Sequence, residues 1–294
     1  MLPFSIVDVF TLPSAEGAPT PYTGNQLAVV YEGQDLSTGQ MQALAREFGF
    51  SETAFVLPAT VDEADYRARI FTPTEELPFA GHPTIGSAIA AVGSGRVRPK
   101  HDTVVQECAA GLMTLGLHRG ADGAVRAAKL TSTLLEVGDV IDAATAASAC
   151  GLDASRVIGT PQATGAGYDH NFVRLAEADV TAAVHRPGAL TKVYPFSFDP
   201  ETGAVHGRLF HEGLGEDPAT GSAALALGVY LVEHGLLTGD GTHRYEIAQG
   251  AETGRPSALY GEVLVEDGRA AAVSVTGSAV TVAEGTLLTL PGAK

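Results

Sequence analysis

The chain has 294 residues, 45% of them hydrophobic and 18% charged, and its 34 acidic and 18 basic residues give a formal net charge of −16. This length favours two domains, because single hydrophobic cores stop growing at about 250–300 residues. The acidic balance argues against nucleic acid and anionic membrane surfaces as partners, since both are bound through clustered Lys and Arg.

Neither a membrane span nor a secretion signal is predicted. The chain has no run of about 18 apolar residues, and Met1–Ser5 lack a basic segment followed by an apolar one. We therefore expect a cytoplasmic protein. Cys108 and Cys150 form no CxxC motif, so two buried, reduced thiols are expected, with a single disulfide as the alternative.

The first half of the chain reads mainly as strands with two helices. Alternating or β-branched runs predict strands at 4–10, 25–31, 53–57 and 65–71. A helix is expected to begin at Ser37 or Thr38 and to end at Gly49, because these residue types cap helices. A second helix is expected at 83–92, where apolar residues recur at helical spacing.

The second half repeats this mixture. Strands are predicted at 127–135, 171–175, 192–198, 207–211, 245–248, 258–265 and 271–276. Helices are expected at 139–149 and 221–233, the latter ending before Gly235.

The helices at 83–92 and 221–233 are apolar on nearly every side, so each must be buried on every side. The predicted fold is therefore α+β, with two pseudo-symmetric lobes that each wrap a curved, mostly antiparallel sheet around one central helix. We expect one lobe to comprise 1–122 plus about 278–294 and the other 123–277. The functional site is expected in the cleft between them.

Common cofactor and metal motifs are missing from the sequence. There is no HExxH zinc motif, no GxxxxGK[ST] phosphate loop, no GxGxxG after a strand and no GxSxG elbow. We therefore expect chemistry without a metal or other cofactor.

The N-termini of the two apolar helices are candidate binding sites for a small carboxylate. Each presents unpaired backbone N–H groups and the positive end of a helix dipole. Gly81 and Gly221 allow close approach, and Ser222 adds a hydroxyl. The alternative is that these glycines only permit tight turns.

Three ionisable residues stand beside these helices or a strand. Glu52 lies between a helix end and an apolar strand, His82 precedes Pro83, and Asp217 precedes Pro218. Each has an ordinary interpretation as well: a solvated turn for Glu52, packing or capping for His82, and a helix cap for Asp217. Glu216 is expected to be solvated.

A series of short motifs runs along the chain: Gly24-Asn25, Ala28-Val29, Ala45-Arg46-Glu47-Phe48, Ser51-Glu52-Thr53-Ala54-Phe55, Arg69-Ile70-Phe71-Thr72-Pro73, Glu76-Leu77-Pro78-Phe79-Ala80-Gly81-His82-Pro83-Thr84, Glu216-Asp217-Pro218-Ala219-Thr220-Gly221-Ser222-Ala223, Gln249-Gly250 and Gly254-Arg255-Pro256-Ser257. They resemble, in the same order, the motifs of PhzF-like (phenazine biosynthesis-like) proteins. One departure is Gln26, where the family usually has Pro after Gly-Asn.

The resemblance implies a fold similar to diaminopimelate epimerase, usually a homodimer, and an isomerase that needs no cofactor. By position, Glu52 would be the general acid/base, with His82 and Asp217 as its polar partners. Gly81, Gly221 and Ser222 would cradle a substrate carboxylate, and Asn25 lies near the substrate. The implied substrate is a cyclic amino acid of dihydro-hydroxyanthranilate type.

The expected reaction is a proton shift in which Glu52 removes a proton at one carbon and returns it at another. Burial beside Phe50 and Phe55 would suit such a dual role. Two alternatives stay open. A racemase on this fold would use two thiols, but the matching positions are Ala80 and Ala219. A non-catalytic binding protein would keep the cleft without the chemistry.

Overall fold

The computed structural model describes residues 1–188 and 190–292, and its secondary structure is mixed α+β. The chain divides into two compact units, one formed by Met1–Leu130 with the segment from Gly277 onward, the other by Thr131–Thr276. The first unit extends past the expected boundary at 122, because Val125–Ser132 (β8) pairs antiparallel with Gly111–Arg119 (β7).

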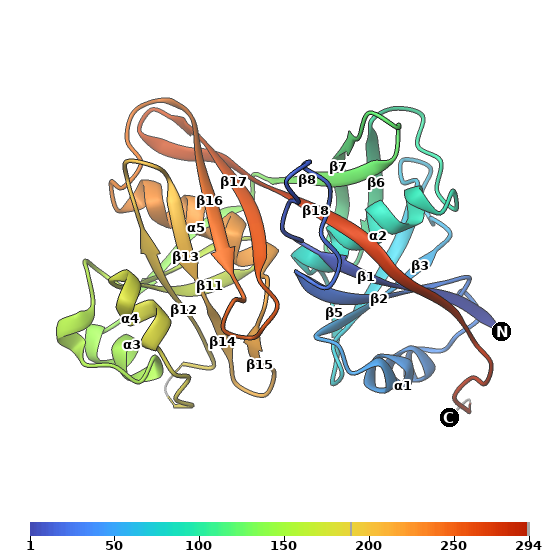
Figure 1. Cartoon of the computed structure of the whole chain (residues 1–294), viewed down its shortest axis with the longest axis horizontal. Helices are drawn as coiled ribbons and strands as arrows, with labels where there is room; N and C mark the ends of the chain where they lie inside the picture. Colours follow the sequence, from blue (N-terminus) through green and yellow to red (C-terminus); the bar gives the residue numbers. More distant parts are fainter. Residues whose placement is uncertain (189, 293–294) are drawn as a thin grey trace. The chain divides into compact units, whose positions relative to one another are not determined.

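The first unit contains two helices, α1 (Thr38–Phe48) and α2 (Gly81–Gly93), and the strands β7 and β8 named above (Figure 1). Its further strands are β1 (Leu2–Val9), β2 (Asn25–Tyr31), β3 (Glu52–Leu57), β4 (Tyr66–Phe71), β5 (Glu76–Leu77) and β6 (Thr103–Cys108). Ser37 begins α1 with a capping box, and Gly49 ends it in the left-handed conformation at φ 67°, as the sequence predicts.

The second unit contains α3 (Ala143–Ala149), α4 (Glu177–Ala182), α5 (Gly221–Glu233) and a short 3-10 helix at Ala154–Arg156. Its strands are β9 (Leu135–Val140), β10 (Gln162–Ala166), β11 (Asp169–Arg174), β12 (Lys192–Phe198), β13 (Ala204–Gly207), β14 (Leu209–His211), β15 (Gly215–Asp217), β16 (Gly241–Gln249) and β17 (Ser257–Glu266). The last strand, β18 (Arg269–Leu287), pairs with β17 and then with β1 of the first unit.

The two units share one order of strand pairing. In the first unit β1–β2 is antiparallel, β2–β3 parallel across α1, β3–β4 antiparallel, β4–β6 parallel across α2, and β6–β7 antiparallel. In the second, the same sequence of pairings runs through β10–β11, β11–β12 across α4, β12–β13, β13–β16 across α5, and β16–β17. The topology is therefore repeated within the chain.

Helices α2 and α5 lie in the cores of their units. Every residue from Gly81 to Ala91 is buried, and α2 packs against β1, β2, β3, β4, β6 and β7. Helix α5 packs against β9, β10, β11 and β17. The predicted bounds of α5 are confirmed, whereas α2 begins at Gly81 rather than at Pro83. Burial on all sides follows from the lack of a polar face.

Some predicted elements were wrong. The helix expected at 139–149 begins only at Ala143, because Asp142 accepts the Thr145 backbone N–H at 2.9 Å and Asp139 and Val140 belong to β9. The strand expected at 127–135 is two strands, β8 and β9. The strand expected at 207–211 is interrupted at Arg208.

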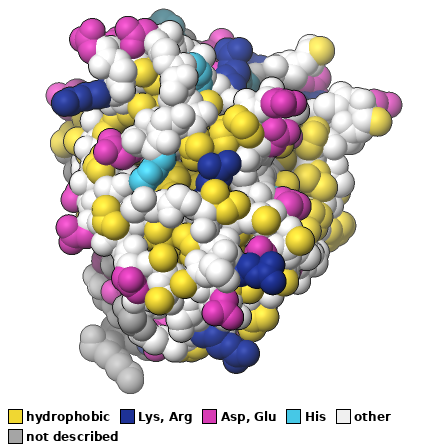
Figure 2. Space-filling model, turned by 90° about the vertical axis from the view of Figure 1, so that its left-hand side faces the viewer, with side chains coloured by type: hydrophobic (Ala, Val, Ile, Leu, Met, Phe, Trp, Pro, Cys, Tyr) yellow, Lys and Arg dark blue, Asp and Glu magenta, His cyan; other side chains and the backbone are white. Residues whose placement is uncertain are grey.

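Cys108 and Cys150 are both free and buried, as predicted. On the face shown in Figure 2, Asp and Glu side chains are scattered among apolar and basic ones. The excess negative charge there is distributed over the surface rather than gathered into a single acidic patch.

Close packing of α2 makes Gly86 a sensitive position. A Cβ atom there would lie 2.5 Å from Val9 Cγ2 and 2.7 Å from Leu27 Cδ2. We expect Gly86→Ala to lower the free energy of unfolding by about 1–3 kcal/mol through overpacking. Gly93, in the last turn of the same helix, has open space around its Cβ position.

Gly93→Ala is therefore the control, and it should be neutral or stabilise the protein by up to about 1 kcal/mol. Urea unfolding of both variants measures the difference. Equal stabilities of the two variants would contradict close packing at Gly86.

Candidate active site

In the first unit the structure brings Glu52, His82 and Asn25 together at the N-terminus of α2. Glu52 is the first residue of β3, and its side chain is 14% exposed. His82, the second residue of α2, places Nδ1 at 3.4 Å from Glu52 Oε2 and at 3.4 Å from Asn25 Nδ2. Asn25 Oδ1 accepts a hydrogen bond of 3.1 Å from Ser51 Oγ. Residues from two strands thus converge on one helix end.

His82 is neutral near pH 7 despite its proximity to Glu52. Its side chain is only 4% exposed, and this burial lowers its pKa to about 3, although a hydrogen bond to the Gln26 backbone acts in the opposite direction. None of the described residues provides a hydrogen-bond partner for its buried Nε2. The contact with Glu52 is therefore a polar contact of a neutral imidazole rather than an ion pair.

The surroundings of Glu52 differ from those expected. Phe55 is buried, but it belongs to a cluster with Met41, Leu44 and Phe71 that includes the buried face of α1. Alternation along β3 places residues 52 and 55 on opposite faces of the strand. Phe50 stacks on Phe48, with ring centroids 6.3 Å apart. Phe55 therefore does not supply the apolar environment of Glu52.

In the second unit Asp217 and Thr220 form the turn into α5. Thr220 is the N-cap residue, but its hydroxyl donates to Asp217 Oδ2 at 2.6 Å instead of capping the helix. Gln249 Nε2 donates both to the Asp217 carbonyl at 2.8 Å and to Thr220 Oγ1 at 3.0 Å. Tyr194 donates to Gln249 Oε1 at 3.0 Å. The ordinary capping group is thus directed away from the helix N-terminus.

Ser222, the second residue of α5, contacts His170 of β11, with Oγ 2.9 Å from His170 Nε2. His170 is only 2% exposed, and burial, with Lys192 and His211 nearby, holds its pKa well below the usual value. Sequence analysis missed His170 because its partner is 52 residues away, and no local motif announces a contact of that span.

Glu216 is a correction to the sequence interpretation. It was expected to be solvated, but its carboxylate accepts two hydrogen bonds from Arg208, at 2.8 and 2.7 Å. Arg208 is 6% exposed and also donates to the Val180 and Ala183 carbonyls. A bidentate pair of this kind is strong and fixes geometry, so Glu216 is linked through Arg208 to the C-terminal end of α4.

The C-terminal motif supports the turn before α5. Gly250 has φ 82°, and a Cβ atom there would collide with the carbonyl oxygens of Pro218 and Arg255. Ser257 Oγ donates to the Pro218 carbonyl at 2.9 Å. These residues shape the backbone that carries Asp217 and Ser222.

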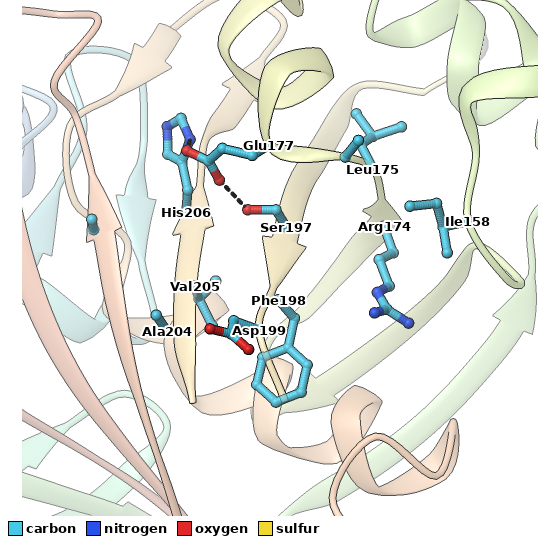
Figure 3. A pocket seen from close by; sticks show the side chains of 12 residues that line it. Ile158, Arg174, Leu175, Glu177, Ser197, Phe198, Asp199, Ala204, Val205 and His206 are labelled. Atoms are coloured by element: carbon cyan, nitrogen blue, oxygen red, sulfur yellow. Dashed lines mark hydrogen bonds and ion pairs between the residues drawn. The ribbon is translucent and has the colours of Figure 1, made fainter. Parts of the chain in front are cut away.

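A separate pocket of about 540 Å³ opens in the second unit (Figure 3). It is lined by residues of α4, β12 and β13, among them Glu177, which accepts from Ser197 Oγ at 2.5 Å and contacts His206 Nδ1 at 2.8 Å. None of the predicted site residues lines it. Its polar contacts hold α4 onto the sheet.

Two features are absent from residues 1–188 and 190–292, the part of the chain that the structure describes. Among them no helix is long and apolar enough to cross a membrane. Within the same part of the chain, no group of three or more His, Cys, Asp or Glu side chains is arranged to hold a metal ion.

The chain is similar in sequence to proteins of one known family. The family model described as "Phenazine biosynthesis-like protein" matches residues 7–285. The chain is 33% identical to trans-2,3-dihydro-3-hydroxyanthranilate isomerase of Pseudomonas fluorescens, over 97% of this chain and 99% of that one. The enzyme of the same name from Pseudomonas aeruginosa is 34% identical, over 96% and 98%.

Solved structures agree with this match. A phenazine biosynthesis protein of the PhzF family from Bacillus anthracis superposes with a TM-score of 0.83 at 25% identity, covering 98% of this chain and 99% of that one. A predicted epimerase from Pseudomonas aeruginosa gives 0.80 at 31% identity, covering 98% and 100%. Fold and sequence therefore define an isomerase-type protein.

The chain belongs to the phenazine biosynthesis-like, or PhzF, protein family, as its motifs predict. Curated relatives over nearly its full length are named isomerases, which supports the same class of enzyme for this chain.

Burial of His82 predicts an acid-sensitive fold. Because its pKa is lowered on folding, the unfolded chain binds more protons between about pH 6.5 and 3, and stability is lost as the pH falls through that window. Between pH 7.5 and 5.0 we expect wild type to lose roughly 2 kcal/mol more than His82→Gln. Urea unfolding at both pH values measures this, and parallel losses would contradict it.

Proposed function

We propose that this chain is a cofactor-independent isomerase that moves a proton, and with it a double bond, within a small cyclic carboxylate of the trans-2,3-dihydro-3-hydroxyanthranilate type. The proposal depends chiefly on Glu52, a largely buried carboxylate beside the buried, neutral His82 at the N-terminus of α2. The substrate class is taken from the names of the relatives that match nearly the whole chain.

In the proposed reaction, the Glu52 carboxylate removes a proton from a substrate carbon. The electron pair of that C–H bond forms a new double bond as the existing one shifts, and protonated Glu52 returns the proton to the far carbon. No electron is lost or gained overall. His82 Nδ1 lies 3.4 Å from Glu52 Oε2 and 3.4 Å from Asn25 Nδ2. Through these contacts His82 and Asn25 would keep the Glu52 side chain oriented. Such contacts are often long in ligand-free sites and shorten when substrate binds.

A substrate carboxylate would be held by the backbone N–H groups of Gly81 and Gly221 and by the Ser222 hydroxyl. Support comes from the N-caps of both helices. Ala80 has no polar side chain with which to cap α2, and the Thr220 hydroxyl is bound to Asp217. Helix N-termini that lack a side-chain cap attract anions. Asp217, whose carboxylate accepts the Thr220 hydroxyl at 2.6 Å, would be a further polar partner of the substrate.

A single base fits a proton shift better than a racemisation. Leu27 pairs with Glu52 in the parallel β2–β3 ladder, and Phe172 pairs with Tyr194 in the corresponding β11–β12 ladder. Tyr194 thus occupies the position in the second unit that Glu52 occupies in the first. Its burial raises its pKa, and its hydroxyl is bonded to Gln249. Two-thiol chemistry lacks its residues, since Ala80 and Ala219 stand at the helix N-termini.

The test is NMR spectroscopy in D₂O with trans-2,3-dihydro-3-hydroxyanthranilate. Wild type should shift the double bond, and deuterium should appear at the new C–H position to the extent that protonated Glu52 exchanges with solvent before it returns the proton. Glu52→Gln should lose this activity by at least about 100-fold, because general acid–base catalysis contributes about 10²–10⁴-fold. Activity that survives in Glu52→Gln would exclude Glu52 as the base.

The matched control is the double variant Cys108→Ala/Cys150→Ala, which should keep turnover within about threefold, since both thiols are buried and burial raises the pKa of each, which disfavours the reactive thiolate. Loss of activity in this variant, with its fold intact, would favour a thiol mechanism. A ligand that binds but returns unchanged, without deuterium, would favour a binding protein.

A further inference from the structure

The contact between His170 and Ser222 joins a fully buried imidazole to the hydroxyl beside the N-terminus of α5. The two atoms, His170 Nε2 and Ser222 Oγ, are 2.9 Å apart, and Ser222 is half-buried whereas His170 is 2% exposed. The other ring nitrogen, Nδ1, is buried and meets no hydrogen-bond partner among the described residues. The Ser222 hydroxyl is therefore the hydrogen-bonding contact that orients this ring.

A similar arrangement, with different residue types, occurs in the first unit. Asn25 lies two residues before Leu27, the partner of Glu52, and it contacts His82, the second residue of α2. His170 lies two residues before Phe172, the partner of Tyr194, and it contacts Ser222, the second residue of α5. In both units a buried polar side chain of the strand holds the side chain at the second position of the core helix.

We propose that His170 is a positioning residue for Ser222: its neutral ring donates Nε2–H to Ser222 Oγ and so directs the hydroxyl proton toward the substrate carboxylate. This inference rests on the proposed function, in which Ser222 binds that carboxylate. His170 itself does not touch the substrate in this account.

The choice of tautomer follows from burial. A neutral imidazole carries one N–H and one lone pair. With the proton on Nε2, the buried Nδ1 holds only an unpaired acceptor; with the proton on Nδ1, a buried N–H would be left without a partner. Orphaned buried N–H groups are rarer and less tolerated than orphaned acceptors. The Nε2–H tautomer is therefore favoured, and Ser222 Oγ acts as its acceptor.

Burial keeps the His170 ring neutral, and its neighbours add to this effect and pack against the ring. Lys192 of β12 and His211 of β14 both disfavour a positive charge on His170. Lys192 is itself held over the Tyr168 ring at 3.7 Å and lies 3.5 Å from Asp169 Oδ1. The Tyr168 ring packs edge-on against His170, with centroids 5.4 Å apart. A ring that stays neutral across the working pH range holds the Ser222 hydroxyl in one orientation.

The first experiment compares two amide replacements by steady-state kinetics with trans-2,3-dihydro-3-hydroxyanthranilate. The amide nitrogen of Gln reaches about as far as histidine Nε2, whereas that of Asn reaches only as far as Nδ1. His170→Asn should raise KM about tenfold with kcat within about twofold, because one hydrogen bond to the bound carboxylate is misdirected. His170→Gln should restore KM to within about threefold of wild type.

Ser222→Ala should raise KM at least as much, and His170→Asn should add nothing to it, because residues that act through one group are not additive. Equal KM values for the Asn and Gln variants, or additive effects in the double variant, would overturn the inference.

A second measurement separates this inference from the proposed function. The ¹⁵N spectrum of histidine-labelled wild type, with His170 assigned by its loss in His170→Gln, reports which ring nitrogen carries the proton. A neutral ring protonated on Nε2 from pH 6 to 8 supports the inference even if the chosen substrate is not turned over. A neutral ring protonated on Nδ1, or a charged ring, would overturn it even in an active enzyme.

Discussion

The structure depends on two helices that have no polar face and must be covered on every side. Residues Gly81–Ala91 of α2 are all buried, and α5 is buried at nearly every position. Strands enclose each helix, and a sheet that continues around it removes its apolar surface from water. Small side chains on the helices allow the strands to approach closely. At Gly86 even a single methyl group would clash with the neighbouring side chains. A helix enclosed in this way has its polar backbone exposed only at its ends.

Those ends are held by a buried, hydrogen-bonded series of Tyr, Gln and Thr in each unit, although the members lie at different positions of the two units. Tyr66 donates to Gln106 at 2.7 Å, and Gln106 donates to Thr84 of α2 at 3.2 Å. In the second unit Tyr194 of β12, Gln249 and the N-cap residue Thr220 form a series of the same residue types at other positions of the repeated topology. Each bond contributes about 0.5–1.5 kcal/mol, but a buried group that loses its partner costs about 1–3 kcal/mol. Such networks hold a helix N-terminus in one position relative to its sheet.

Sequence reasoning succeeded where the signals are local. Helix α1 was predicted from Ser37 and Gly49, and α5 from an apolar run ended by glycine. The prediction of secondary structure failed where tertiary contacts override local signals. Asp139 and Val140 were expected in a helix but belong to strand β9, which pairs with β10.

The residues of the candidate site likewise fall into those that the sequence could identify and those that only the fold brings together. Glu52, His82 and Asp217 could be named by resemblance to a family, and the structure brings the first two into contact. The pairs Arg208–Glu216 and His170–Ser222 depend on strand register and on how the chain returns to the helix. No property of these residues taken singly distinguishes them from solvated or packing residues, so no local pattern could have revealed them.

The strand β18 has a consequence for the order in which the protein can fold. Its first residues pair with β17 of the second unit, and its last pair with β1, where Leu2 faces Leu287. During synthesis at about 5–20 residues per second, β1 therefore waits on the order of tens of seconds for its partner. Throughout that interval one edge of β1 stays open to pairing with other chains. A ribosome-bound intermediate of this protein would present that edge to chaperones until β18 is complete.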